Sequence, residues 1–130
     1  MVIMMTVPTY KRKEGKLLVL NSAIIIHNTI IRLVKNEELF PKRYSEILTK
    51  PFIDNSRNVM YYIRNANEVK KVDEETINLR RGYINKAIFY ANNLYVDIQT
   101  NLEFNPQNID KYTFLLEELD KLLNLLGKWS

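Results

Sequence analysis

The chain has 130 residues, no cysteine, a single histidine and a net charge of +4. The absence of cysteine excludes disulfides, thiolate metal sites and cysteine nucleophiles, and one histidine leaves little material for a metal cluster or an acid–base pair. We therefore expect no enzyme and no catalytic, metal or cofactor site, and three glycines and four prolines are too few for a turn-rich all-β protein.

The beginning of the chain predicts a flexible basic arm, residues 1–15, ahead of a folded domain of residues 16–130. Both a frayed terminus and an arm that reaches a partner or a neighbouring subunit fit this composition. The apolar residues of the arm precede its charges, which is the reverse of the order in a signal peptide, so we expect a cytoplasmic protein. The positive charge of the arm comes from Lys11, Arg12 and Lys13.

A first helix is predicted from Lys16 to Asn36, because apolar residues recur there at three- and four-residue steps. Polar and charged residues interrupt its longest apolar stretch, so we expect no membrane span. His27 on this stripe is interpreted as a partly buried histidine that hydrogen-bonds a neighbour, rather than as a catalytic residue. The predicted core stripe is Leu17, Leu20, Ile24, His27, Ile31 and Val34, widened by Leu18, Ile25, Ile26 and Ile30.

A second helix is predicted from Lys42 to Lys70, directly after Pro41, which suits the first turn of a helix. Pro51 falls inside this span, where it removes a hydrogen bond and clashes with the preceding turn, at a cost of about 3 kcal/mol. We therefore expect a kink or a short break near Leu48 and Thr49. The predicted core positions are Leu48, Phe52, Val59, Ile63, Ala66 and Val69.

Two further helices follow. The third is predicted from Glu74 to Leu102, with Asp73, Glu74 and Glu75 placing negative charge where the helix dipole favours it. The fourth begins between Pro106 and Ile109 and carries a regular leucine stripe, and Gly127 is expected to end it so that Trp129 packs back against the domain. Four amphipathic helices joined by short turns predict an all-α protein, an antiparallel up-down four-helix bundle. The core stripe of the third helix is Ile77, Ile84, Ile88, Ala91, Tyr95, Ile98 and Leu102, and that of the fourth is Tyr112, Leu115, Leu116, Leu119, Leu122, Leu123 and Leu126.

Charge is distributed unevenly along the chain: residues 1–71 carry a balance of +7 and residues 72–130 a balance of −3. Five cations in the basic half recur at seven-residue steps, which places them on one face of the second helix, pointing away from the core. Such a row suits a phosphate backbone, but a solvated face is an equally ordinary interpretation, since Glu46, Asp54 and Glu68 stand at pairing distances along the helix. The row consists of Arg43, Lys50, Arg57, Arg64 and Lys71.

Two other groups of residues have competing interpretations. Four tyrosines are able to stack nucleic-acid bases, but on helices such residues are more often core edges or subunit contacts. These are Tyr61, Tyr62, Tyr90 and Tyr95. An acidic group in the fourth helix is interpreted as solvated charge, because the Glu-x-x-His pairs of di-iron bundles are missing. It consists of Glu117, Glu118 and Asp120.

Short motifs resemble one protein family. Phe40-Pro41-Lys42 precedes the long second helix, which ends in Ala66-Asn67, and the chain closes in Leu125-Leu126-Gly127-Lys128-Trp129. This order is similar to the four-helix-bundle family of the accessory variability determinant of diversity-generating retroelements, together with the proteins encoded by intervening sequences in bacterial large-subunit ribosomal RNA genes. The resemblance covers Lys16 to Trp129.

The resemblance implies a barrel-shaped homopentamer that is not itself an enzyme. It further implies nucleic-acid binding through a basic surface and a partnership with a retroelement reverse transcriptase during mutagenic copying of template RNA. We expect weak, non-specific binding of structured RNA or an RNA–DNA hybrid by the row of five cations, helped by Lys11, Arg12 and Lys13. The alternative is a structural or protein-interaction bundle from a mobile element without a nucleic-acid role.

Overall fold

The protein is all-helical. The computed structural model describes the backbone of residues 9–129 and the side chains of residues 15–129, and no strand occurs in this part of the chain, which confirms the predicted all-α class. Its four α-helices are α1 (Thr9–Val34), α2 (Lys50–Glu68), α3 (Glu74–Phe104) and α4 (Thr113–Trp129). Three shorter segments connect them, the 3₁₀ helix η2 (Lys42–Tyr44), the π-helical turn η3 (Ser45–Thr49) and the 3₁₀ helix η4 (Pro106–Tyr112).

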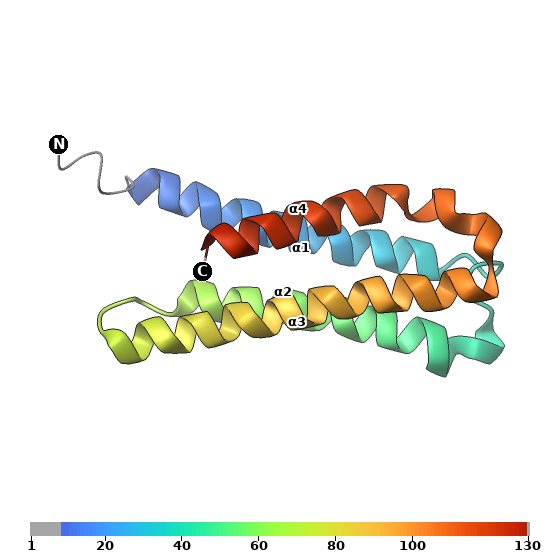
Figure 1. Cartoon of the computed structure of the whole chain (residues 1–130), viewed down its shortest axis with the longest axis horizontal. Coiled ribbons are helices and arrows are strands. Elements are labelled where there is room, and N and C mark those ends of the chain that lie inside the picture. Colours follow the sequence, from blue (N-terminus) through green and yellow to red (C-terminus); the bar gives the residue numbers. More distant parts are fainter. Residues whose placement is uncertain (1–8, 130) are drawn as a thin grey trace.

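The four helices lie alongside one another along the long axis of the molecule (Figure 1). α2 packs against α1 and α3, and α4 packs against the same two helices. Each helix therefore contributes its apolar side to one shared interior, and these contacts are compatible with a four-helix bundle.

The first helix begins earlier than predicted. α1 starts at Thr9, so residues 9–15, which were assigned to the arm, are helical. Gly15 does not stop the helix, because an isolated glycine costs a helix only about 1 kcal/mol. Residues 1–8 of the arm, and the side chains of Lys11, Arg12 and Lys13, lie outside the part that the structure describes.

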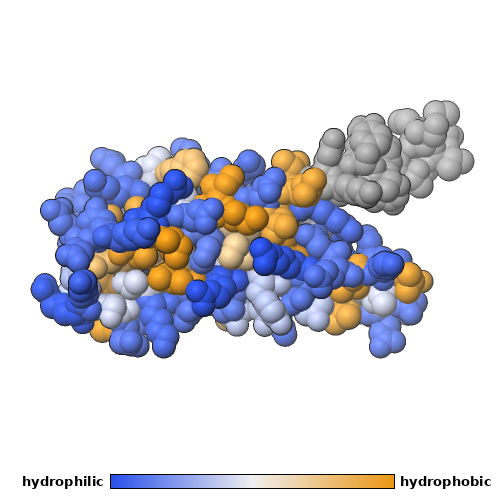
Figure 2. Space-filling model, turned by 180° about the vertical axis from the view of Figure 1, so that it is seen from behind, coloured by the Kyte–Doolittle hydropathy of each residue, from blue (hydrophilic) through white to orange (hydrophobic). Residues whose placement is uncertain are grey.

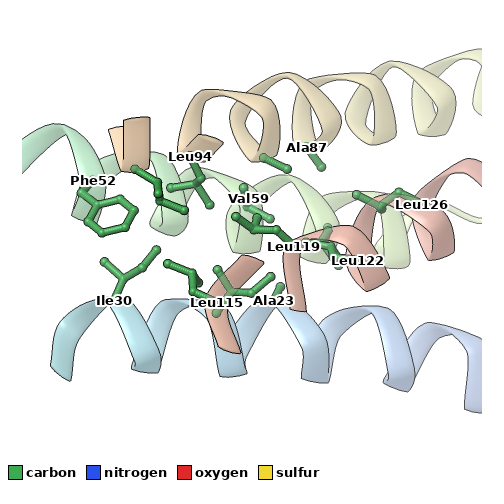
Figure 3. Packing of buried hydrophobic residues seen from close by; sticks show 14 of the residues in the cluster. Ala23, Ile30, Phe52, Val59, Ala87, Leu94, Leu115, Leu119, Leu122 and Leu126 are labelled. Atoms are coloured by element: carbon green, nitrogen blue, oxygen red, sulfur yellow. The ribbon is translucent and has the colours of Figure 1, made fainter. Parts of the chain in front are cut away.

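The core is built from aliphatic side chains of all four helices, with Ala23 and Ile30 from α1 facing Val59 and Leu94 across the interior (Figure 3).

The predicted stripes of the second and fourth helices are largely confirmed. The stripe of the first is only partly right: Ile26 and Ile30 are buried as predicted, but Leu18 and Ile25 are exposed. α1 is apolar nearly all round, so its periodicity does not identify the inward face. Its buried residues are Val19, Ser22, Ala23, Ile26, Thr29 and Ile30, whereas Leu17 is exposed.

α1 contains one long apolar stretch. Gly15–Val34 is long and apolar enough to cross a membrane by length and composition alone, despite the polar residues within it. The core helix of a soluble protein and a signal sequence meet the same criterion. In this structure, Ala23 and Ile26 of this stretch are almost completely buried against the other helices, but only 28% of its apolar window is buried.

Pro51 interrupts the second helix as predicted. The chain forms the π-helical turn η3 over Ser45–Thr49, and the regular helix α2 starts only at Lys50. The Lys50 N–H bonds to the Ser45 carbonyl, five residues back. Pro51 thus lies at the junction of η3 and α2, where the π-helical turn replaces the regular hydrogen-bond pattern that proline interrupts.

The connections are held by local hydrogen bonds. Asp73 caps α3, since its side chain accepts from the Thr76 N–H at 2.8 Å and its own N–H donates to Thr76 Oγ1 at 3.1 Å. Asn101, buried in α3, donates from Nδ2 to the Leu39 carbonyl at 2.9 Å and accepts from the Tyr112 hydroxyl. This one side chain fixes the α1–α2 connection and η4 to the same point of α3.

The end of α4 differs from the prediction. Gly127 lies within the helix, which continues to Trp129, and it does not adopt a positive φ. Trp129 is half-buried rather than enclosed. The indole instead lies against the side chain of Arg80 from α3.

Candidate nucleic-acid interface

The predicted row of cations is exposed along its whole length, but only its middle lies on one regular helix. Lys50, Arg57 and Arg64 belong to α2, whereas Arg43 lies in η2 and Lys71 follows the end of the helix. Seven residues of helix rise about 10 Å. The three α2 cations, which we call the cationic row from here on, therefore stand about 10 Å apart on one outward face.

The carboxylates that were expected to pair with these cations do not do so. Within the described part of the chain, no carboxylate oxygen lies within 4.0 Å of Lys50, Arg57 or Arg64. The two residues at the ends of the original row make other interactions. The Arg43 guanidinium carbon lies 4.9 Å from the centre of the Tyr44 ring, and Lys71 also interacts with another group. The cationic row thus offers three exposed positive charges that are not neutralised by ion pairs.

An apolar band borders the cationic row. Figure 2 shows the side of the molecule formed by α1 and α2, where apolar side chains run along α1 above the hydrophilic surface of α2. Leu17 and Leu18 are each more than half exposed on α1. A shallow hollow beside Leu17 is lined by Lys16, Leu17, Leu20 and Asn67. Asn67 Oδ1 is buried without a hydrogen-bond partner.

His27 joins α1 to α2 beside the cationic row. Its Nδ1 lies 2.8 Å from Ser56 Oγ on α2, which confirms the predicted hydrogen-bonded histidine. The Ser56 hydroxyl donates to the Ile53 carbonyl at 2.9 Å, so its oxygen is left to accept a hydrogen bond from the Nδ1–H of His27. Burial lowers the pKa of His27, and the positive charge of Arg57 lowers it further.

The tyrosines divide into two groups. Tyr61, Tyr62 and Tyr90 come together where α2 meets α3, whereas Tyr95 lies apart and donates its hydroxyl to Asp120 of α4. Burial, followed by this hydrogen bond and the charge of Asp120, raises the pKa of Tyr95. Sequence reasoning missed three members of the first group, although their helical spacing on α3 was a usable signal: Tyr83, Lys86 and Phe89.

The acidic residues of α4 are solvated in part. Glu117 and Asp120 are exposed as predicted, whereas Glu118 is half-buried. Glu118 accepts a hydrogen bond from Ser22 of α1 at 3.2 Å, and Asp120 accepts one from Tyr95 of α3. Both contacts are between helices, so these carboxylates join α4 to its neighbours. Sequence spacing alone does not reveal a hydroxyl partner on another helix.

No family model, curated protein or solved structure matches the chain. The family resemblance therefore stays a prediction from its short motifs. In the structure, Phe40 of the first motif is buried and stacks on Phe52 with ring centres 5.8 Å apart. Trp129 of the last motif lies at the end of α4.

Proposed function

We propose that this protein is a cytoplasmic, non-catalytic, nucleic-acid-binding accessory subunit that folds as an antiparallel up-down four-helix bundle. One observation supports it most directly: Lys50, Arg57 and Arg64 form an exposed row on α2 with no carboxylate within ion-pairing distance. Structured RNA or an RNA–DNA hybrid is the proposed ligand. Arg43, Lys71 and the cations of the N-terminal arm, Lys11, Arg12 and Lys13, extend the positive surface in the proposal.

The chemistry of the row suits phosphate rather than base recognition. Exposed cations that neutralise phosphates release condensed counterions, and binding then weakens as salt is raised. Phosphate contacts fix position but carry no sequence information. Three cations on one subunit give weak binding, and repetition around an oligomer raises the avidity if the nucleic acid spans more than one subunit.

The test is a filter-binding titration at two salt concentrations with structured RNA. The variant Lys50→Gln, Arg57→Gln, Arg64→Gln keeps its fold, because exposed substitutions usually change stability by no more than about 0.5 kcal/mol. It binds more weakly, and each lost phosphate contact reduces the slope of log affinity against log salt by about 0.7–0.9.

A control variant removes the same charge from elsewhere. Lys111, Lys121 and Lys128 are exposed on η4 and α4, and all three are changed to Gln. This control retains most of the salt-dependent binding. Equal binding by wild type and the cationic-row variant, or no salt-dependent binding by wild type, contradicts the proposal.

The proposed protein partner is a retroelement reverse transcriptase, and it rests on the family resemblance. A reverse-transcriptase gene with nearby paired repeats beside the gene for this chain would support this partnership. Co-purification of the two gene products is the direct test. A reverse transcriptase that elutes separately from this chain at low salt contradicts it.

The second candidate is a structural or protein-interaction bundle from a mobile element without a nucleic-acid role. The exposed apolar side chains of α1 favour it, because Leu17 is 57% and Leu18 51% exposed. Both candidates include self-association, and the resemblance makes a homopentamer the proposed assembly. Light scattering at micromolar concentration tests this, and a scattering mass of one subunit contradicts it.

A further inference from the structure

A continuous group of aromatic rings crosses the outer side of α2 and α3. The rings of Tyr62 and Tyr90 stack between the two helices with centres 5.6 Å apart and an angle of 6° between their planes. Tyr61 packs on Tyr62 at 5.1 Å and 80°, and Phe89 packs on Tyr90 at 5.2 Å and 84°. These four side chains, which we call the aromatic platform, form one row of ring contacts from α2 to α3.

The two outer rings of the aromatic platform remain open to solvent. Tyr61 is 57% exposed and Phe89 is 60% exposed, whereas Tyr62 and Tyr90 are half-buried against the core. The inner pair therefore joins the helices and holds the outer pair in place. Two preordered aromatic rings with more than half of their surface uncovered offer a stacking surface that a ligand can occupy at little entropic cost.

Positive charge surrounds this surface. Tyr61 follows Arg57 by four residues and precedes Arg64 by three, so the three side chains are neighbours on the exposed side of α2. Lys86 of α3 lies with its Nζ 5.3 Å from the centre of the Tyr62 ring. The aromatic platform is thus continuous with the cationic row.

We infer that the aromatic platform and the cationic row together bind a single-stranded nucleic acid, with a base on Tyr61 and the flanking phosphates on Arg57 and Arg64. This inference rests on the proposed function and narrows its ligand to the unpaired segments of structured RNA, since a fully paired RNA–DNA hybrid would contact the cationic row alone. Aromatic rings beside a positive groove are the means by which proteins bind single strands without reading sequence. Bases inside a duplex are stacked on each other, so their faces are closed to Tyr61.

The same charges disfavour a two-fold symmetric dimer through this surface, whereas the head-to-tail contacts of the proposed pentamer join two different surfaces and are tested by the oligomer mass of Tyr61→Ala. A symmetric contact through this surface places the same patch on both subunits. Arg57, Arg64 and Lys86 would then lie near their own counterparts, and these like charges would repel one another. A polyanion with exposed ring faces satisfies both features of the surface.

The experiment measures the affinity of Tyr61→Ala for a polyuridine oligonucleotide and for an RNA duplex of the same length. We expect Tyr61→Ala to weaken oligonucleotide binding by about five- to a hundredfold and to leave duplex binding unchanged. Tyr61→Phe, which keeps the ring, retains the wild-type affinity. Phe114→Ala, which removes a 53% exposed ring from α4, is the matched control and binds normally.

A second variant tests whether weaker binding by Tyr61→Ala comes from a disturbed fold and not from the lost ring. Phe89→Ala alters the other end of the platform from a different helix, and it weakens oligonucleotide binding in the same direction. Unchanged oligonucleotide affinity in Tyr61→Ala and Phe89→Ala overturns this inference, while a weakened cationic-row variant in the same assay leaves the proposed function standing. Loss of oligomer mass in Tyr61→Ala with normal oligonucleotide binding identifies a subunit contact instead. The absence of salt-dependent binding to both probes overturns the inference and the proposed function together.

Discussion

The guanidinium of Arg80 covers the face of Trp129, with its central carbon 4.2 Å from the centre of the indole ring. Arg80 also donates from Nη1 to the Trp129 carbonyl at 3.2 Å. Arg80 lies near the start of α3 and Trp129 at the end of α4, where positive charge is favourable for the helix dipole. The pair therefore fixes the end of α4 to α3 by a ring contact and a hydrogen bond at once.

Arg80→Ala should destabilise the fold by about 1–3 kcal/mol, because it removes the cation–π contact, the hydrogen bond and the packing of a buried side chain. Trp129→Ala should cost about as much, and less than a fully enclosed tryptophan would, since the indole is half-buried. Urea unfolding of both single variants and the double variant measures the coupling. Additive losses contradict a direct interaction between the two side chains.

The link through Asn101 provides a second stability test. Asn101→Ala leaves the Leu39 carbonyl and the Tyr112 hydroxyl without their partner in a buried place, at about 1–3 kcal/mol for each group. Tyr112→Phe removes only the hydroxyl and should cost less. Thermal unfolding followed by circular dichroism compares the two variants. If Asn101→Ala lowers the unfolding temperature less than Tyr112→Phe does, the prediction that the two hydrogen bonds of Asn101 stabilise the fold is contradicted.

Gly82 offers a stabilising substitution. It is exposed inside α3, its φ is not positive, and an added methyl group would meet nothing within 4 Å. Gly82→Ala should therefore raise the unfolding free energy by about 0.5–1 kcal/mol through the lower entropy of the unfolded chain. Gly127→Ala, in the last turn of α4, is the comparison and should gain less because helix ends fray. Chemical denaturation distinguishes the two, and a destabilised Gly82→Ala contradicts this prediction.

The sequence predicted best those features that depend on local chemistry. Pro51 indicated the break ahead of α2, and the acidic residues from Asp73 onward indicated the start of α3. The leucine stripe of α4 identified the inward face because its opposite face is polar. α1 has no such contrast, so the prediction placed Leu17 and Ile24 inward while the structure buries Val19 and Ala23.

The sequence predicted only the part of the candidate site that lies on a single helix. The exposure of Lys50, Arg57 and Arg64 follows from their spacing relative to Phe52 and Val59 on the same helix. The aromatic platform needs the rotation of α3 relative to α2, which brings Tyr90 over Tyr62. That rotation is set by packing between helices and not by the periodicity of either one.

His27 gives the free protein a pH dependence. The ordinary pKa of histidine is 6.5, and burial together with Arg57 lowers the pKa of His27 in the folded state. As the pH falls through 6.5, the unfolded chain takes up a proton before the folded chain does, so the unfolding free energy decreases until the pH passes the lowered value. His27→Gln should remove this part of the pH dependence in urea titrations. An unchanged slope just below pH 6.5 in that variant contradicts the prediction.

The same residue reports on binding at the cationic row. Because His27 is the only histidine of the chain, its imidazole protons give an isolated NMR signal. A phosphate bound at Arg57 adds negative charge beside the residue that lowers the pKa of His27, so saturation with oligonucleotide should raise that pKa. Thermodynamic linkage then requires the oligonucleotide to bind more tightly as the pH falls through this range. Arg57→Gln should raise the pKa of His27 in the free protein and abolish its response to oligonucleotide, whereas Lys121→Gln on α4 should change neither. A His27 titration curve that saturating oligonucleotide leaves in place would show that the nucleic acid binds away from Arg57.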